Sequence, residues 1–209
     1  MKNLILLICF VSTSFGLLGQ TKYEKGMKKA FELWQQDKVW DAANMFERIA
    51  QAEPDQWLPS YYVSQINVIK SFGETDETVL TAQLKKALDF LNDTKAIAKE
   101  DPNVMVLEAQ YYTAWIAYDG QQYGMKYSGK VAQLYQQAAA LAPENPIVLL
   151  GKAEWDIGAA RFFGQSTEPY CKDLDRAAEL FTTFKPETEF HPSYGAERVQ
   201  EVIKTNCNK

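Results

Sequence analysis

The feature that most constrains the fold of this chain is a spacing of about 45 residues between similar pairs of packing residues. Each pair has a small or β-branched residue followed, four positions later, by a large apolar one. Successive pairs begin 45, 44 and 46 residues apart, since their first members stand at positions 42, 87, 131 and 177. A fixed period combined with helical spacing is typical of a solenoid of helix hairpins. The pairs are Ala42 with Phe46, Ala87 with Leu91, Val131 with Tyr135, and Ala177 with Phe181.

Prolines punctuate the same pattern and set the expected boundaries of the hairpins. Each helical stretch stops near a proline, and proline cannot continue a helix interior. One hairpin cannot bury its apolar face alone, so stacked neighbours are needed to complete the core. We therefore predict an all-α fold of four hairpins at about 23–56, 57–102, 103–145 and 146–186, with a linker reaching residue 191. The prolines are Pro54, Pro102, Pro143 and Pro186.

Residues 192–209 have the pattern of a capping helix followed by a short tail. Pro192 suits the first turn of a helix. Val199, Val202 and Ile203 share one face, and charged side chains cover the other. A terminal repeat needs such a polar-backed cap. We expect the helix to span about 192–206.

The repeat residues resemble those of a known family. Gly26, Ala30, Leu33, Ala42, Phe46 and Pro54 fall where the tetratricopeptide repeat (TPR) places its small and large packing residues, and 101–103 and 143–145 resemble the turn between repeats. The resemblance implies a right-handed α-solenoid whose first helices line a concave groove. The chain also looks like exported bacterial TPR proteins of about 200 residues, for which no defined activity is implied. Segments 22–27, 162–165, 184–186 and 191–195 carry that closer likeness.

The repeats depart from the standard unit, which has about 34 residues. We expect the extra residues in longer first helices and in the loops that follow them. Equivalent loops of a solenoid line up along one edge. Segments 71–75, 118–124 and 163–166 carry glycine and aromatic residues. They are predicted to form one continuous lip.

The first twenty residues differ from the rest. Lys2 is their only charged side chain, and 4–11 is a continuous apolar run followed by small and polar residues. This pattern predicts a secretory signal peptide over 1–20, the alternative being a buried N-terminal helix. We expect an exported protein, periplasmic or secreted. No later stretch has the roughly 20 apolar residues of a membrane-spanning helix.

The cysteines support the same compartment. Cys9 lies in the predicted leader, which leaves Cys171 and Cys207 as a pair. In an oxidising compartment the two are expected to form a disulfide that ties the last hairpin to the C-terminal helix. Two unlinked buried thiols are the alternative, because a bridge requires suitable geometry.

The sequence offers little catalytic chemistry. The chain has a formal net charge of −5 and one histidine. This balance gives no reason to expect nucleic acid as a partner, a metal or a cofactor. No phosphate-binding loop, dinucleotide fingerprint, nucleophile elbow or paired-cysteine metal spacing occurs. His191 is expected to pack against or cap the last helix. The predicted protein is not an enzyme, although a hydrolase whose residues converge only in three dimensions stays a weaker hypothesis.

Aromatic side chains concentrate on the predicted first helices. Neighbours on a helix are about 100° apart, so Tyr61 and Tyr62, or Tyr111 and Tyr112, cannot both face the same core. Our first hypothesis is a non-catalytic scaffold that binds a protein or peptide through its groove and loop edge. The alternative is a small molecule or glycan in an aromatic pocket, and an enclosed cavity of roughly 300–1,000 Å³ favours it. Candidate binding residues are Tyr62, Tyr112, Trp115, Asp119, Trp155 and Arg161.

Overall fold

The computed structural model describes residues 21–207, which fold as α-helices, one short 3₁₀ helix and no strand. The expected all-α class is confirmed. The predicted signal peptide and the last two residues lie outside the described part. No helix within 21–207 is both long and apolar enough to cross a membrane. The elements are α1 Lys22–Gln35, α2 Val39–Ala52, α3 Trp57–Ser71, α4 Glu77–Ala98, α5 Pro102–Tyr118, α6 Gly120–Leu141, α7 Pro146–Phe162, η1 Glu168–Tyr170, α8 Cys171–Phe181 and α9 Ala196–Asn206.

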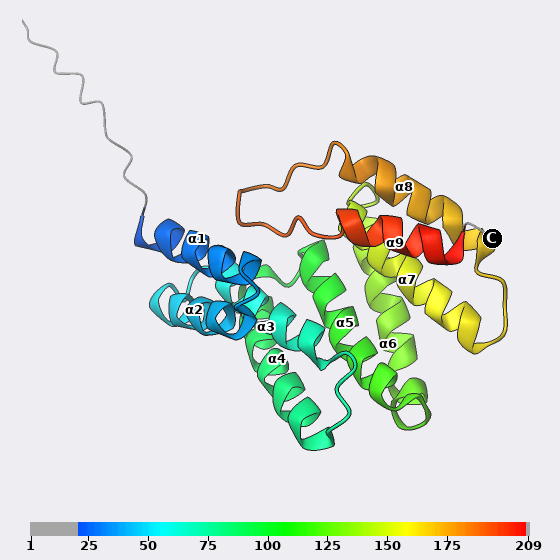
Figure 1. The fold of residues 1–209 in the computed structure, drawn as a ribbon, viewed down its shortest axis with the longest axis horizontal. Helices are drawn as coiled ribbons and strands as arrows, with labels where there is room; N and C mark the ends of the chain where they lie inside the picture. The colour runs from blue at the N-terminus through cyan, green and yellow to red at the C-terminus, as the bar shows by residue number, and fades with distance from the viewer. Residues whose placement is uncertain (1–20, 208–209) are drawn as a thin grey trace, which may run out of the picture.

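The helices pack as consecutive pairs (Figure 1). α1 lies against α2, α3 against α4, α5 against α6, and α7 against α8. Each pair also contacts the next through its second helix, and α3, α5 and α7 touch one another in turn. The C-terminal α9 packs on α8. The first helices of the later pairs are thus neighbours, and this places their side chains close together.

The repeated packing residues lie in the core, as their spacing predicts. All of them are buried except Phe181, which is partly exposed. Gly26 has the role expected of a small residue between helices. A Cβ at Gly26 would lie 3.2 Å from the Ile49 side chain, so the missing side chain lets α1 and α2 approach closely.

Side-chain caps define where the helices begin. Thr21 and Glu24 form a capping box at the start of α1. Asp101 and Asn145 accept hydrogen bonds from the backbone at the starts of α5 and α7, where proline occupies the first position. Such caps satisfy amide groups that the helix itself leaves free. They define the first residues of α1, α5 and α7, whereas α3 has no side-chain cap.

The lip prediction is wrong at its middle segment. Residues 118–124 are not a loop, because α5 ends at Tyr118 and α6 begins at Gly120. The single residue between them, Asp119, accepts hydrogen bonds from the amides of Gln121 and Gln122 at 2.9 Å. An aspartate cap at this position outweighs the low helix propensity of the nearby glycines. Real loops follow α3 and α7, at 72–76 and 163–167.

The last helix starts later than predicted. It begins at Ala196, and Pro192 is buried in the preceding irregular segment instead of lying in a first turn. Gly195 occupies the cap with φ = 111°, a conformation that favours glycine. A Cβ there would also approach Phe181 to 2.8 Å and Leu150 to 2.9 Å. Residues 192–195 are irregular and not helical, and they take part in a long-range contact.

That contact is made by residues 182–195, which we call the strap. The strap leaves α8, runs across the molecule to α1 and returns to α9 (Figure 1). Phe190 is buried in the first hairpin, with its ring 5.8 Å from Tyr23 and 6.2 Å from Phe31. The Tyr62 hydroxyl donates a hydrogen bond of 2.7 Å to the Phe190 carbonyl. The strap therefore joins the first hairpin to the last.

Two further residues of the strap extend the same attachment. His191 packs its ring 5.5 Å from Trp57, at the start of α3, and hydrogen-bonds Thr188, so it lies against α3 and not against the last helix as expected. The hydroxyl of Tyr194 lies 3.2 Å from that of Tyr61. Covering α3 from this side explains why Tyr61 and Tyr62 are both buried, which the helix geometry alone did not predict.

The disulfide between Cys171 and Cys207 is present, with the sulfur atoms 2.08 Å apart and a sequence separation of 36. Replacing both cysteines by serine should lower the free energy of unfolding by about 4 kcal/mol in the chain-entropy model. Urea unfolding measures the change, and wild-type protein in reductant serves as the control. The role assigned to the bridge is wrong if its loss leaves the unfolding midpoint unchanged.

The strap makes a separate prediction. Phe190→Ala removes a buried ring and should destabilise the protein by about 3–5 kcal/mol. Leu141→Ala, at the exposed end of α6, should change stability by less than about 1 kcal/mol. Thermal unfolding of the two variants tests the contrast. Equal midpoints would mean that the strap does not hold the two ends of the array together.

Candidate ligand-binding site

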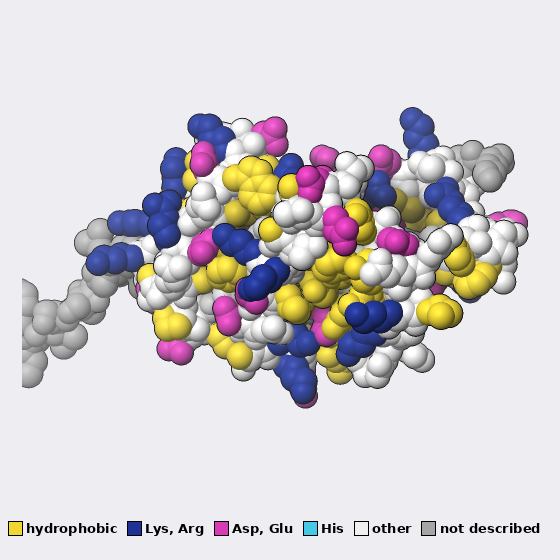
Figure 2. All heavy atoms as spheres, turned by 90° about the horizontal axis from the view of Figure 1, so that it is seen from below, with side chains coloured by type: hydrophobic (Ala, Val, Ile, Leu, Met, Phe, Trp, Pro, Cys, Tyr) yellow, Lys and Arg dark blue, Asp and Glu magenta, His cyan; other side chains and the backbone are white. Residues whose placement is uncertain are grey.

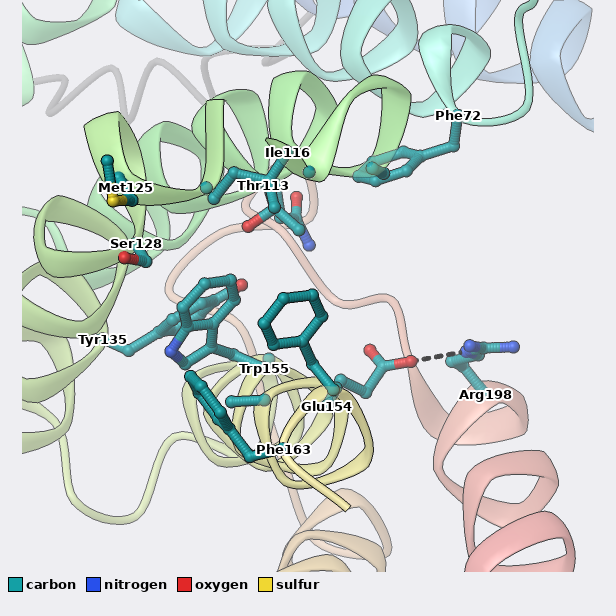
Figure 3. Close-up of a pocket in the computed structure, with 18 residues that line it drawn as sticks. Phe72, Thr113, Ile116, Met125, Ser128, Tyr135, Glu154, Trp155, Phe163 and Arg198 are labelled. Carbon is teal, nitrogen blue, oxygen red and sulfur yellow. Dashed lines mark hydrogen bonds and ion pairs between the residues drawn. The ribbon is translucent and has the colours of Figure 1, made fainter. Parts of the chain in front are cut away.

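A cavity of about 760 Å³ lies between the α5–α6 hairpin and α7, with contributions from the loop after α3 and from α9. Its lining is largely apolar. Figure 3 shows rings and aliphatic groups from the two sides facing one another across the opening. The large apolar and aromatic side chains that line it are Phe72, Ile116, Met125, Tyr135, Trp155, Phe162 and Phe163.

Small residues on both walls leave this space unfilled. Gly120 and Gly124 of α6 and Gly158 of α7 all line the cavity. A Cβ at any of the three would meet no atom within 4 Å. Gly151 differs, because a Cβ there would lie 2.9 Å from the ring of Tyr135. The missing side chain at Gly151 therefore lets the ring of Tyr135 pack against the backbone of α7 and form part of the cavity wall.

The mouth of the cavity exposes large apolar side chains. Phe162 is 79% exposed, Phe163 70% and Met125 96%. The two phenyl rings lie edge to face, with centroids 5.1 Å apart. Figure 2 views the molecule from below and shows apolar patches among charged side chains on that face. Clustered exposed rings of this kind are typical of surfaces that bind a ligand or partner.

One ion pair lies at the polar end of the cavity. Nε of Arg198, on α9, donates to Oε1 of Glu154, on α7, at 2.8 Å. Nη1 of the same arginine donates to Glu201 at 2.8 Å. Burial acts to lower the pKa of Arg198, but the hydrogen bonds to both glutamates raise it overall. Figure 3 places this pair at one side of the ring-lined space.

Tyr135 supplies the phenol group in the cavity lining, and this phenol stays neutral. Burial raises its pKa well above the ordinary value, and the nearby Tyr194 and Glu154 act in the same direction. A neutral phenol is a poor ligand for a metal ion. The cavity lining includes no histidine or cysteine, and no cluster of three metal-ligating side chains occurs within 21–207. The site is built for apolar contact.

Of the six candidate residues, Trp155 lines this cavity. The aromatic ones on earlier helices pack elsewhere. Tyr62 is buried under the strap and borders a separate polar hollow beside α1. Tyr112 lies 5.2 Å from Tyr111, and the half-buried Trp115 lies 5.0 Å from Tyr123. These rings fill spaces between neighbouring helices.

The two charged candidates also lie outside the cavity lining. Asp119 caps α6, so its carboxylate is engaged with backbone amides. Arg161 is exposed in the last turn of α7 and does not line the cavity. A cap and a solvated side chain are the ordinary roles for such residues.

Several lining residues were missed, although part of their signal was visible. Phe72, Gly120, Gly124 and Phe163 all lie within the segments predicted to form a lip, and the structure brings them to one cavity. Gly158 was overlooked. Its signal is a glycine inside a predicted helix, at a position where alanine would be more stable.

Comparison with known proteins gives a likeness in structure but not in sequence family. No family model and no curated protein matches the chain. Among solved structures, the HusA haemophore from Porphyromonas gingivalis is similar, with a TM-score of 0.78 at 17% sequence identity. The match covers 91% of this chain and 96% of that chain. At this level of identity the likeness shows a shared helical fold.

Raised tyrosine pKa values predict a stability that depends on alkaline pH. The phenol of Tyr135 is more easily ionised in the unfolded chain, where its pKa is near the ordinary value of 10.0, than in the fold. The contribution of the neutral Tyr135 phenol to the free energy of unfolding is therefore complete below about pH 10 and is lost as the pH rises above that value. Tyr135→Phe should flatten the decline in unfolding free energy between pH 9 and about 11. Identical declines in the two proteins would contradict the assignment.

Proposed function

We propose that this chain is a non-catalytic protein that binds a flat, largely apolar small molecule of the tetrapyrrole class in the cavity between α5, α6 and α7. The observation that carries the proposal is the apolar cavity itself, with its volume of about 760 Å³. Binding sites for small molecules typically have volumes of about 300–1,000 Å³ and mostly apolar linings. The size and chemistry of the space agree with that range.

The arrangement of its walls favours a flat ligand. Trp155, Phe162 and Phe163 supply ring faces and edges on one side, and Phe72 lies on the other. Aromatic rings stabilise a planar ligand through stacked and edge-to-face contacts. The glycines on α6 and α7 let such a ligand approach the helix backbones closely. The likeness in fold to a haemophore adds a reason to choose tetrapyrroles among flat ligands.

The lining also favours recognition of the organic ring over recognition of its metal. Met125 offers a thioether at the exposed rim, and Tyr135 is a neutral phenol. Haem iron is held by imidazole, thiolate, thioether or tyrosine groups. Within residues 21–207, this lining has no imidazole or thiolate, its phenol is neutral, and its one thioether lies at the exposed rim. A metal-free porphyrin is therefore expected to bind about as tightly as its iron complex.

A peptide fits the site less well than a small molecule. Tyr62, Tyr112 and Trp115, which would have lined an open groove, pack within the array. Glycans need many hydrogen-bonding groups, and this lining has few. The small-molecule alternative considered from the sequence is the function that the geometry supports best.

The proposal includes the architecture and location of the protein. We propose a TPR-like, right-handed solenoid that acts outside the cytoplasm. Consecutive helix pairs with a period of about 45 residues support the first point. The leader-like residues 1–20 and the Cys171–Cys207 disulfide support the second, because disulfides persist in oxidising compartments.

The direct test is titration of the disulfide-bonded protein with protoporphyrin IX and its iron complex, followed by tryptophan fluorescence. Gly158→Leu places a side chain in the cavity and should weaken binding at least about tenfold. Gly129→Leu makes the same exchange on an exposed face of α6 that does not line the cavity, and should leave affinity unchanged. Both replacements improve helix propensity, so neither is expected to unfold its helix.

The outcomes separate the alternatives. Binding of both porphyrins with the predicted loss in Gly158→Leu supports the site and its independence from metal. Binding of the iron complex alone would mean that a ligand to iron has been overlooked. The proposed function is wrong if neither porphyrin binds, or if the two leucine variants behave alike.

A further inference from the structure

The ion pair between Glu154 and Arg198 separates the apolar cavity from a second one. The second cavity has a volume of about 580 Å³ and lies between α7, the end of the strap and the start of α9. Both cavities share the same four residues as a common wall. Gly151 has no side chain, so the wall consists of one amide and the ion pair. The shared residues are Gln110, Gly151, Glu154 and Arg198.

Both spaces have mainly apolar linings, but the polar share is larger in the smaller one. The larger is lined mainly by rings and small apolar residues. The smaller has Ile147 and Leu150 at one side, and Ser193, Tyr194 and Glu197 at the other. A ligand with an apolar body and a short polar arm would match both parts at once. Its arm would pass the wall where Arg198 lies.

We propose that Arg198 binds a carboxylate on the edge of the ligand, and that Glu154 holds this position until the ligand replaces it. The proposal rests on the proposed function, which supplies the apolar body of the ligand. Arg198 is the sole cationic side chain among the described residues that line the larger cavity, and Glu154 is the sole acidic one. The geometry thus identifies one place where a charged group of the ligand can be neutralised.

The guanidinium of Arg198 has more N–H donors than its two glutamate partners engage. An arginine carries five N–H groups in a planar fork. Nε bonds Glu154 and Nη1 bonds Glu201, whereas Nη2 has no hydrogen-bond partner within residues 21–207. Nε and Nη2 point along one edge of the fork, which suits two-point binding of a carboxylate. A ligand carboxylate can therefore start on Nη2 and take Nε as Glu154 leaves.

The charges around Arg198 explain why a ligand carboxylate must displace Glu154. Glu154, Glu201 and Glu197 all lie near Arg198, so adding another anion without displacing one would be unfavourable. The Lys152–Asp156 pair on α7 adds no net charge. Side chains of the ion pair are 32% exposed for Glu154 and 55% for Arg198. Exposed pairs of this type are weak, so the exchange costs little.

Two features of the fold keep Arg198 at the wall. The sharp turn at Gly195 sets the start of α9 at Ala196, two residues before Arg198. The disulfide fixes the other end of α9 at Cys207 against the start of α8. An arginine anchored on a helix held at both ends meets a ligand with little loss of freedom.

The test compares protoporphyrin IX, which has two carboxylates, with its dimethyl ester, which has none. Wild-type protein should bind the diacid about tenfold more tightly than the ester, as expected for a charge-assisted hydrogen bond. Arg198→Gln should abolish this preference without weakening the ester. Glu154→Gln removes the competing carboxylate and should strengthen binding of the diacid by up to about fivefold, leaving the ester unchanged.

Arg176→Gln is the matched control. Arg176 lies on α8 and also pairs with two glutamates, Glu144 and Glu179, but lines neither cavity. This variant should keep the wild-type preference for the diacid.

Failure of this inference can be distinguished from failure of the proposed function. If both porphyrins bind equally well to the wild type, or if Arg198→Gln keeps the preference, the cavity binds porphyrin but Arg198 is not its anchor. Weaker binding of the diacid by Glu154→Gln would contradict the exchange. If neither porphyrin binds the wild type, the proposed function itself is wrong.

Discussion

The attachment of the strap to the first hairpin is the contact on which the rest of the arrangement depends. Helix hairpins packed in a row contact mainly their neighbours, and such arrays have no built-in link between their ends. Here Phe190 is buried beside Tyr23 and Phe31, and its carbonyl receives the Tyr62 hydroxyl. The chain then returns to α9. A local helical array thereby gains a long-range constraint that also places a wall of the cavity.

The cavity exists because small residues occupy positions that would otherwise be filled from both sides. Protein interiors are normally packed closely, and unfilled apolar space is destabilising. Gly120, Gly124 and Gly158 leave such a space, and Phe162 and Phe163 remain exposed at its mouth. A ligand that binds the folded state stabilises it through mass action. On our account the ligand supplies the contacts that these helices lack.

The sequence predicted what arises from local and periodic forces. The recurrence of pairs such as Ala42 with Phe46 indicated how the hairpins pack. The predicted pairing of Cys171 with Cys207 is confirmed. Features that depend on distant segments were not predictable. The burial of Tyr62 depends on a carbonyl 128 residues away. The cavity likewise combines residues from α5, α6, α7 and α9, so no single segment carries its pattern.

The central claim is that a flat aromatic ligand lies between α6 and α7. The amide resonances of glycines report this most directly, because a bound macrocycle shifts nearby nuclei through its ring current. In a ¹⁵N-labelled protein, metal-free porphyrin should shift the amides of Gly124 and Gly158 strongly, and that of Gly26 between α1 and α2 should stay unchanged. Shifts confined to the first hairpin, or none at saturating ligand, would contradict the account.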